Sequence, residues 1–127
     1  IRGLHIQLPP YSQAKLVYCI QGSILDVAID VRKGSPTFGQ SFTIELSEEN
    51  RFQLFVPKGF LHGYSVLSEN ALVGYKCDDF YNKDSESGIH PLDKTLNIDW
   101  QIPSEKQLIS EKDQQAISFL ELPEIIL

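Results

Sequence analysis

Hydrophobic and polar residues alternate with a period of two along much of the chain. In residues 25–31, apolar side chains occupy every odd position, and Asp26 and Asp30 stand between them. Successive side chains of a β-strand point to opposite faces, so this alternation predicts a half-buried strand. The helical period of about 3.6 residues does not fit the same run.

The same pattern recurs in short segments separated by turn-forming residues. It predicts strands over residues 15–20, 38–46, 52–56, 64–67 and 72–77, with turns at 21–23, 33–36, 47–50, 57–59 and 68–70. Short strands about every ten residues favour an all-β sandwich or barrel over alternating strands and helices. Past Tyr81 the pattern loosens, and residues 110–113 predict a short helical or irregular tail that packs across one end of the barrel.

Composition narrows the class of protein. The 127 residues suit one domain, and 42% hydrophobic with 22% charged residues is an ordinary globular balance. No apolar stretch is long enough to span a bilayer. The net charge of -6 argues against nucleic-acid and membrane partners, so an anionic ligand needs a local cluster of positive side chains. Two cysteines are too few for a disulfide scaffold, which predicts a reduced, cytoplasmic protein.

Two histidines occupy positions that suggest a site in a barrel mouth. His62 ends a Pro-x-Gly-x-x-His segment that resembles the second motif of cupin barrels, and His5 matches the histidine of the first motif. Metal-binding cupins have a glutamate seven positions before a strand-ending glycine, where this chain has Lys15 before Gly22. An ammonium group repels a divalent cation, so we expect no metal. The same charge can stabilise an enolate or a phosphate instead.

Seven short segments together carry a more specific resemblance. They read RGLHIQ (2–7), QAKLV (13–17), DVAIDVR (26–32), SPTFG (35–39), PKGFLHG (57–63), YK (75–76) and SEKD (110–113). In this order and spacing the chain resembles the dTDP-4-dehydrorhamnose 3,5-epimerase family. The resemblance implies a cupin-type jelly roll, one domain over residues 1–127, a homodimer and no cofactor. It also implies that the chain lacks the N-terminal strands that family members carry before the first segment.

The resemblance implies a reaction and a role for each matching residue. The substrate, dTDP-4-dehydro-6-deoxy-D-glucose, is inverted at C3 and C5 through an enolate to give dTDP-4-dehydro-L-rhamnose. His5 matches the base and Asp113 its carboxylate partner, while Tyr75 matches the proton donor on the opposite face of the sugar. Lys15 matches the residue beside the C4 oxygen.

Binding residues carry over in the same way. Arg2, His62 and Lys112 match residues near the diphosphate or the sugar, and they supply the positive cluster that the acidic chain requires. Glu86 matches a ligand-contacting glutamate, and Tyr81 an aromatic ring that stacks on thymine.

Three alternatives stay open at this point. A narrower 3-epimerase or 5-epimerase on a related deoxysugar nucleotide would use the same residues. A truncated, non-catalytic cupin that only binds sugar nucleotides would fit the missing N-terminal strands. A metal-dependent cupin isomerase or oxygenase is disfavoured by Lys15.

Overall fold

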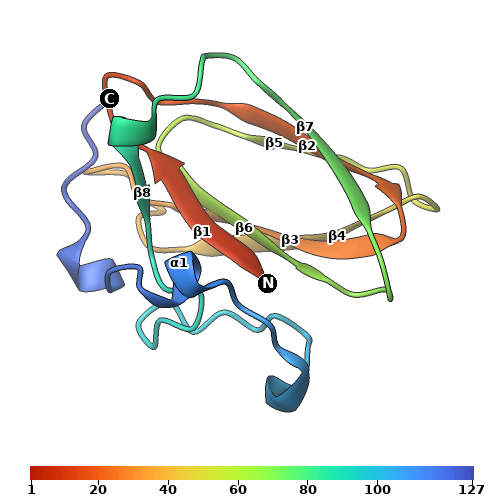
Figure 1. Ribbon diagram of the computed structural model, residues 1–127. Helices are drawn as coiled ribbons and strands as arrows, with labels where there is room; N and C mark the ends of the chain where they lie inside the picture. Colours follow the sequence, from red (N-terminus) through yellow and green to blue (C-terminus); the bar gives the residue numbers. More distant parts are fainter.

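The computed structural model describes residues 1–127 and contains two antiparallel β-sheets (Figure 1). The eight strands are β1 (Arg2–Gln7), β2 (Lys15–Gln21), β3 (Ser23–Asp30), β4 (Ser41–Ser47), β5 (Gln53–Val56), β6 (Phe60–Val66), β7 (Leu72–Cys77) and β8 (Glu86–Gly88). The larger sheet has the order β4-β3-β6-β1-β8, and the smaller one β5-β2-β7. The predicted all-β fold is confirmed.

Helical structure is confined to short turns in the last third of the chain. These are the 3-10 turns η1 (Lys83–Ser85), η2 (Ser104–Lys106) and η3 (Phe119–Glu121), together with the single-turn helix α1 (Glu111–Gln114). None of the helices is long and apolar enough to cross a membrane.

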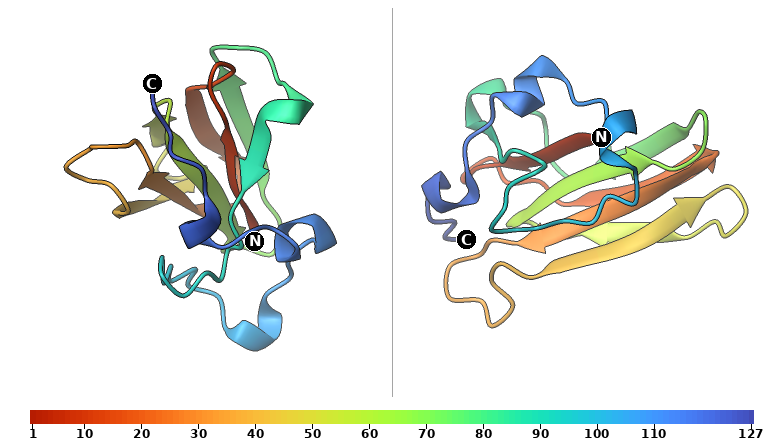
Figure 2. Two further views of the ribbon diagram at one scale, coloured as in Figure 1. Left: turned by 90° about the vertical axis from the view of Figure 1, so that its left-hand side faces the viewer. Right: turned by 90° about the horizontal axis from the view of Figure 1, so that it is seen from below.

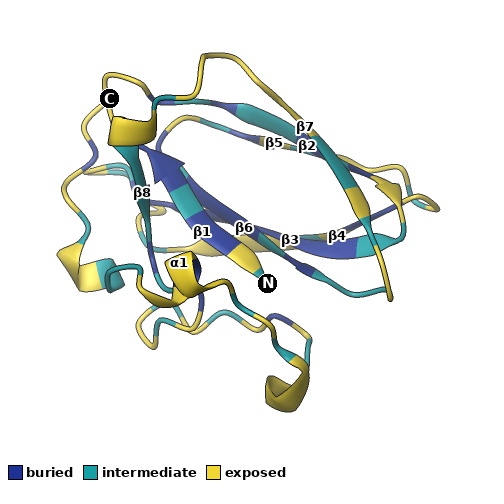
Figure 3. Cartoon of the chain, in the orientation of Figure 1, coloured by how far each residue is buried: buried dark blue, intermediate teal, exposed yellow.

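The central strands of the larger sheet are covered on both faces. Its inner face meets the smaller sheet in a core formed by Val17, Cys19, Ile24, Ala28, Leu46 and Val56. Its outer face meets the C-terminal tail in a second core formed by Leu4, Ile6, Leu25, Val27, Ile29, Val31, Leu61, Ile89, Trp100 and Ile125. Figures 2 and 3 show the tail following the outside of this sheet and the buried colour running along β1 and β3.

Two expectations from the sequence are therefore wrong. The tail covers a face of the larger sheet and not an end of the barrel, and Trp100 anchors it at 2% exposure. The strand predicted over residues 25–31 is not half-buried, because the tail covers one face and the smaller sheet the other. Asp26 and Asp30, on its polar side, are 0% and 1% exposed. Each of these carboxylates consequently needs a partner inside the protein.

Strands β1 and β8 escaped prediction, and β6 begins at Phe60, ahead of the predicted residue 64. Close contact between the backbones of β1 and β6 explains part of the failure to predict these strands. Gly3 has a φ of +120°, and a Cβ there would lie 2.7 Å from the Cα of Gly63 on the neighbouring strand. Only glycine fits such an approach, so the pairing of β1 with β6 depends on two residues that carry no hydrophobic pattern.

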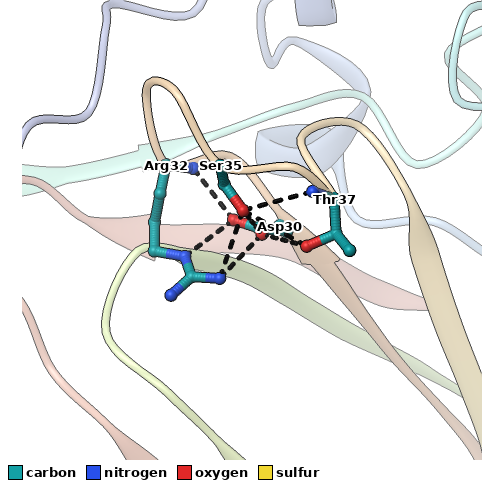
Figure 4. Close-up of polar contacts among 4 residues, drawn as sticks. All are labelled: Asp30, Arg32, Ser35 and Thr37. Atoms are coloured by element: carbon teal, nitrogen blue, oxygen red, sulfur yellow. Dashed lines mark hydrogen bonds and ion pairs between the residues drawn. The ribbon is translucent and has the colours of Figure 1, made fainter.

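Asp30 organises the loop between β3 and β4 (Figure 4). Its carboxylate accepts hydrogen bonds from Nε and Nη2 of Arg32, at 2.9 and 2.8 Å, and from the hydroxyls of Ser35 and Thr37. The Arg32 guanidinium in turn lies 4.9 Å from the ring centre of Phe60, at the start of β6. The Ser-Pro-Thr segment, residues 35–37, therefore stabilises this loop through its hydrogen bonds to Asp30.

Candidate active site

A cavity of about 360 Å³ opens between the two sheets. Residues of β1, β2, β6, β7, β8 and the tail contribute to its wall. The predicted site residues that line it are Arg2, His5, Lys15, His62, Tyr75, Tyr81, Glu86 and Lys112. Asp113 lies directly behind His5. The structure thus brings residues from positions 2 to 113 of the chain around one space.

His5 and Asp113 form a hydrogen-bonded pair. Nε2 of His5 lies 2.6 Å from Oδ1 of Asp113, while Oδ2 accepts the backbone N–H of Gly3 at 3.1 Å. The Ser110 side chain caps α1, which places Asp113 against β1. Burial raises the pKa of Asp113, but the hydrogen bonds from His5 and Gly3 outweigh this and leave that pKa below its usual value.

A second histidine–aspartate pair lies beside the first. His5 and His62 are partners across β1 and β6, and Nε2 of His62 lies 2.6 Å from Oδ1 of Asp26 on β3. The Oδ2 atom of Asp26 is buried without a hydrogen-bond partner. The sequence predicted His62 as a site residue but not Asp26. The one signal for Asp26 was a carboxylate within an apolar strand, because such a carboxylate needs a hydrogen-bond partner if both faces of the strand are covered.

The smaller sheet supplies the opposite wall. Lys15 on β2 is paired in register with Cys77 on β7, and Val17 with Tyr75 two residues along, so the side chains of Lys15 and Tyr75 share the inner face. Burial lowers the pKa of the Lys15 ammonium. The cavity therefore has two histidine–aspartate pairs on one side, and an ammonium and a phenol on the other.

Three side chains meet at the rim of the cavity. The Tyr81 hydroxyl donates to Oε2 of Glu86 at 2.5 Å, and Nζ of Lys112 donates to the same oxygen at 3.1 Å. Burial raises the pKa of Glu86, but these two hydrogen bonds and the Lys112 charge outweigh it and lower that pKa. With Arg2 and Lys15, the cavity wall holds three basic side chains against one carboxylate, that of Glu86, despite the acidic chain.

The chain matches a known protein family over most of its length. The model of the family described as dTDP-4-dehydrorhamnose 3,5-epimerase matches residues 1–121. The chain belongs to this family. It is 49% identical over 121 residues to the dTDP-4-dehydrorhamnose 3,5-epimerase of Shigella flexneri, which covers 95% of this chain and 66% of the relative. The family resemblance seen in the sequence is thereby confirmed.

Solved structures of the epimerase family show the same fold. The dTDP-4-dehydrorhamnose 3,5-epimerase of Elizabethkingia anophelis superposes with a TM-score of 0.92 at 52% identity, covering 94% of this chain and 65% of that one. The enzyme of Legionella pneumophila, in complex with dTDP-4-keto-L-rhamnose, gives 0.89 at 48%, covering 96% and 64%. The chain thus spans about two thirds or slightly less of the length of these epimerases.

The remaining polar residues form no metal site. No group of three or more His, Cys, Asp or Glu side chains lies close enough together to hold a metal ion. His90 lies away from the cavity and accepts the backbone N–H of Leu92. One of the lining residues to which sequence reasoning gave no role is Gln7, which lies two positions beyond His5 on β1.

Proposed function

We propose that residues 1–127 act as a cofactor-independent nucleotide-sugar epimerase domain. The reaction is inversion of dTDP-4-dehydro-6-deoxy-D-glucose at C3 and C5, which gives dTDP-4-dehydro-L-rhamnose. The observation that carries the proposal is the His5–Asp113 pair on one wall of a cavity whose other wall presents Lys15 and Tyr75. Membership of the epimerase family supports the same conclusion.

His5 acts as the base in this proposal. Protons at C3 and C5 are acidic because both carbons adjoin the C4 carbonyl, and imidazole is well suited to remove them near neutral pH. Asp113 accepts a hydrogen bond from Nε2–H, which leaves Nδ1 free to take the proton from carbon, and the carboxylate stabilises the imidazolium that forms. The C3 or C5 electron pair passes to the C4 oxygen as the enolate.

Lys15 and Tyr75 complete the reaction from the opposite wall. The Lys15 ammonium stabilises the enolate oxygen, and one such donor typically contributes about 2.7 to 4 kcal/mol to the transition state. Tyr75 then delivers its phenolic proton to the carbon from the face opposite His5, so the centre returns inverted. His5 releases its proton to solvent and Tyr75 regains one from solvent before the second centre reacts. The two sheets thus divide base and acid between them.

The cations and the aromatic ring at the cavity supply the nucleotide site. Arg2, His62 and Lys112 bind the diphosphate or the sugar, Glu86 contacts the ligand, and Tyr81 stacks on thymine. The Legionella enzyme holds a dTDP-sugar, which supports this substrate class. A 3'-monoepimerase of Streptomyces bikiniensis is 33% identical, covering 92% of this chain and 59% of that one, so inversion at one centre is the second candidate.

The cellular setting is part of the same proposal. We infer a homodimer, since large apolar side chains such as Phe42 and Phe55 lie exposed on the edge strands β4 and β5. We also infer a cytoplasmic location, where nucleotide sugars are made and where Cys19 and Cys77, both free, stay reduced.

Isotope exchange tests the function directly. Incubation with dTDP-4-dehydro-6-deoxy-D-glucose in D2O, followed by NMR, should show deuterium at C3 and C5. His5→Asn should lower exchange at least about a hundredfold while nucleotide binding persists, because only the base is lost. His90→Asn, outside the cavity, is the matched control and should exchange normally.

Each other result has a definite meaning. Deuterium at one carbon alone indicates the narrower epimerase. Ligand binding without any exchange indicates a binding module and refutes the proposed activity. Full exchange by the His5→Asn variant would refute the assignment of the base.

A further inference from the structure

Gln7 is a buried amide in the wall of the cavity. It is the last residue of β1. The alternate residues Leu4 and Ile6 pack beneath the tail, so Gln7 lies on the same side of the strand as His5. Only 6% of Gln7 is exposed. Across the sheet it is paired with Glu86, which holds the rim residues Tyr81 and Lys112.

One end of the Gln7 amide is held and the other is not. Nε2 donates to the backbone carbonyl of Tyr11 at 3.2 Å, which distinguishes the nitrogen end of the amide from the oxygen end. Oε1 is buried and has no hydrogen-bond partner. Leaving a buried carbonyl oxygen unpaired costs free energy, so the protein bears this cost in the state without ligand. A ligand that donates a hydrogen bond to Oε1 would remove it.

The chemistry of the ligand limits what the donor can be. A diphosphate offers only acceptor oxygens and cannot satisfy Oε1. A thymine base carries one N–H, but the ring proposed to stack on it, Tyr81, is 61% exposed, whereas Gln7 is 6% exposed. The hexose carries hydroxyl donors and must lie beside His5, about 6 to 7 Å from Gln7 along the strand.

We propose that Gln7 is a specificity-determining residue whose Oε1 accepts a hydrogen bond from a hydroxyl of the hexose. Presenting Oε1 to the cavity takes a rotation of the amide, which the soft terminal torsion of a glutamine permits. A site built around such a bond discriminates against a sugar without the hydroxyl, because the acceptor then stays unpaired. This inference rests on the proposed function, since it assumes a hexose in the cavity.

The test compares a glutamine in the cavity wall with one outside it. Gln7→Met keeps the size of the side chain and removes the acceptor. Gln107→Met is the matched control, because Gln107 lies partly buried outside the cavity and its Nε2 likewise donates to a backbone carbonyl, that of Ile102. Binding of the parent dTDP-hexose, its 2-deoxy and 3-deoxy analogues and dTDP alone is measured by calorimetry, and exchange in D2O is measured alongside.

We expect the wild-type protein to bind one deoxy analogue about tenfold to a hundredfold more weakly than the parent. Gln7→Met should bind the parent as weakly as that analogue, so that discrimination disappears, while dTDP alone binds as before. Gln107→Met should retain the discrimination and behave as wild type.

Three results would overturn the inference. Equal weakening of parent and both analogues by Gln7→Met would mean a purely structural residue. Weaker binding of dTDP alone would mean a contact to the nucleotide. No discrimination in the wild-type protein would mean that a buried water satisfies Oε1. Calorimetry decides these points even if no deuterium is incorporated, and absent exchange in the wild-type protein counts against the proposed function alone.

Discussion

His5 and His62 face each other across β1 and β6, yet their aspartates are held differently. Asp113 has both carboxylate oxygens engaged, one by His5 and one by the Gly3 amide. Asp26 uses one oxygen for His62 and leaves the other buried and unpaired. Asp113 therefore fixes the His5 imidazole more firmly than Asp26 fixes that of His62, because two contacts define the plane of its carboxylate. This difference favours His5 as the base and His62 as a binding residue.

Lys15 gives the reaction a predicted alkaline limit. The ammonium must be protonated to stabilise the enolate, and burial lowers its pKa below the usual value near 10.4. The exchange rate should therefore fall with rising pH at a pH below that of an ordinary lysine. Lys15→Arg should move this limb upward, because a guanidinium keeps its charge to far higher pH.

The measurement is the pH dependence of deuterium incorporation at C3. Lys15→Met is the control. It should exchange about a hundredfold to a thousandfold more slowly, and its rate should show no alkaline fall caused by a lysine. An unshifted alkaline limb in Lys15→Arg would show that another group titrates there.

At the scale of elements, the Asp30 network joins the β3–β4 loop to β6. The hydrogen bonds from Arg32, together with those from Ser35 and Thr37, hold the pKa of the Asp30 carboxyl well below its usual range. Because the folded-state pKa is depressed, the network stabilises the fold fully above the unfolded-state value of about 3.9. That contribution is lost as the pH falls from about 4 toward the folded-state pKa.

Asp30→Asn should therefore destabilise the protein near neutral pH by about 2 to 4 kcal/mol, since a charged acceptor of several hydrogen bonds is removed from a buried position. The difference from wild type should shrink at pH 3 and below. Urea unfolding at pH 7 and pH 3 checks this. A difference of the same size at both pH values would contradict the linkage to Asp30.

The elements also show where prediction from sequence succeeds and where it stops. Residues 72–77 form β7 as predicted, because alternation and flanking turns are local signals. Strand β8 has three residues and exists through its pairing with β1, a contact distant in sequence. The burial of Asp26 depends on the smaller sheet and on His62 of β6, which lies 36 residues later in the chain. No local pattern carries such information.

Some residues of the candidate site could likewise be predicted from the sequence and others could not. Motif spacing placed His5, Lys15 and His62, which come from short, recognisable segments, and the structure brings them to one cavity. Asp26 and Gln7 went unnoticed because their importance lies in which of their atoms are paired. Hydrogen-bond satisfaction is a property of the folded arrangement, so it becomes visible only there.

At the scale of the whole molecule, both sheets end in exposed edges. Strand β4 closes one side of the larger sheet and β5 one side of the smaller, and each carries an exposed phenylalanine. Phe42 on β4 is 54% exposed and Phe55 on β5 is 61% exposed. Unpaired backbone groups beside apolar side chains are a template for pairing with another chain.

We therefore expect the chain to self-associate, with a sedimentation coefficient that rises with concentration in the micromolar range. Phe42→Lys should shift the protein toward the monomer, because a charge on an edge strand opposes sheet-to-sheet pairing. Leu108→Lys is the matched control: Leu108 is 83% exposed but lies in the tail, outside both sheets, so its replacement should leave association unchanged. Equal dissociation by both variants would indicate general hydrophobic contact, and a wild-type chain that sediments as a monomer at every concentration would refute association through these edges.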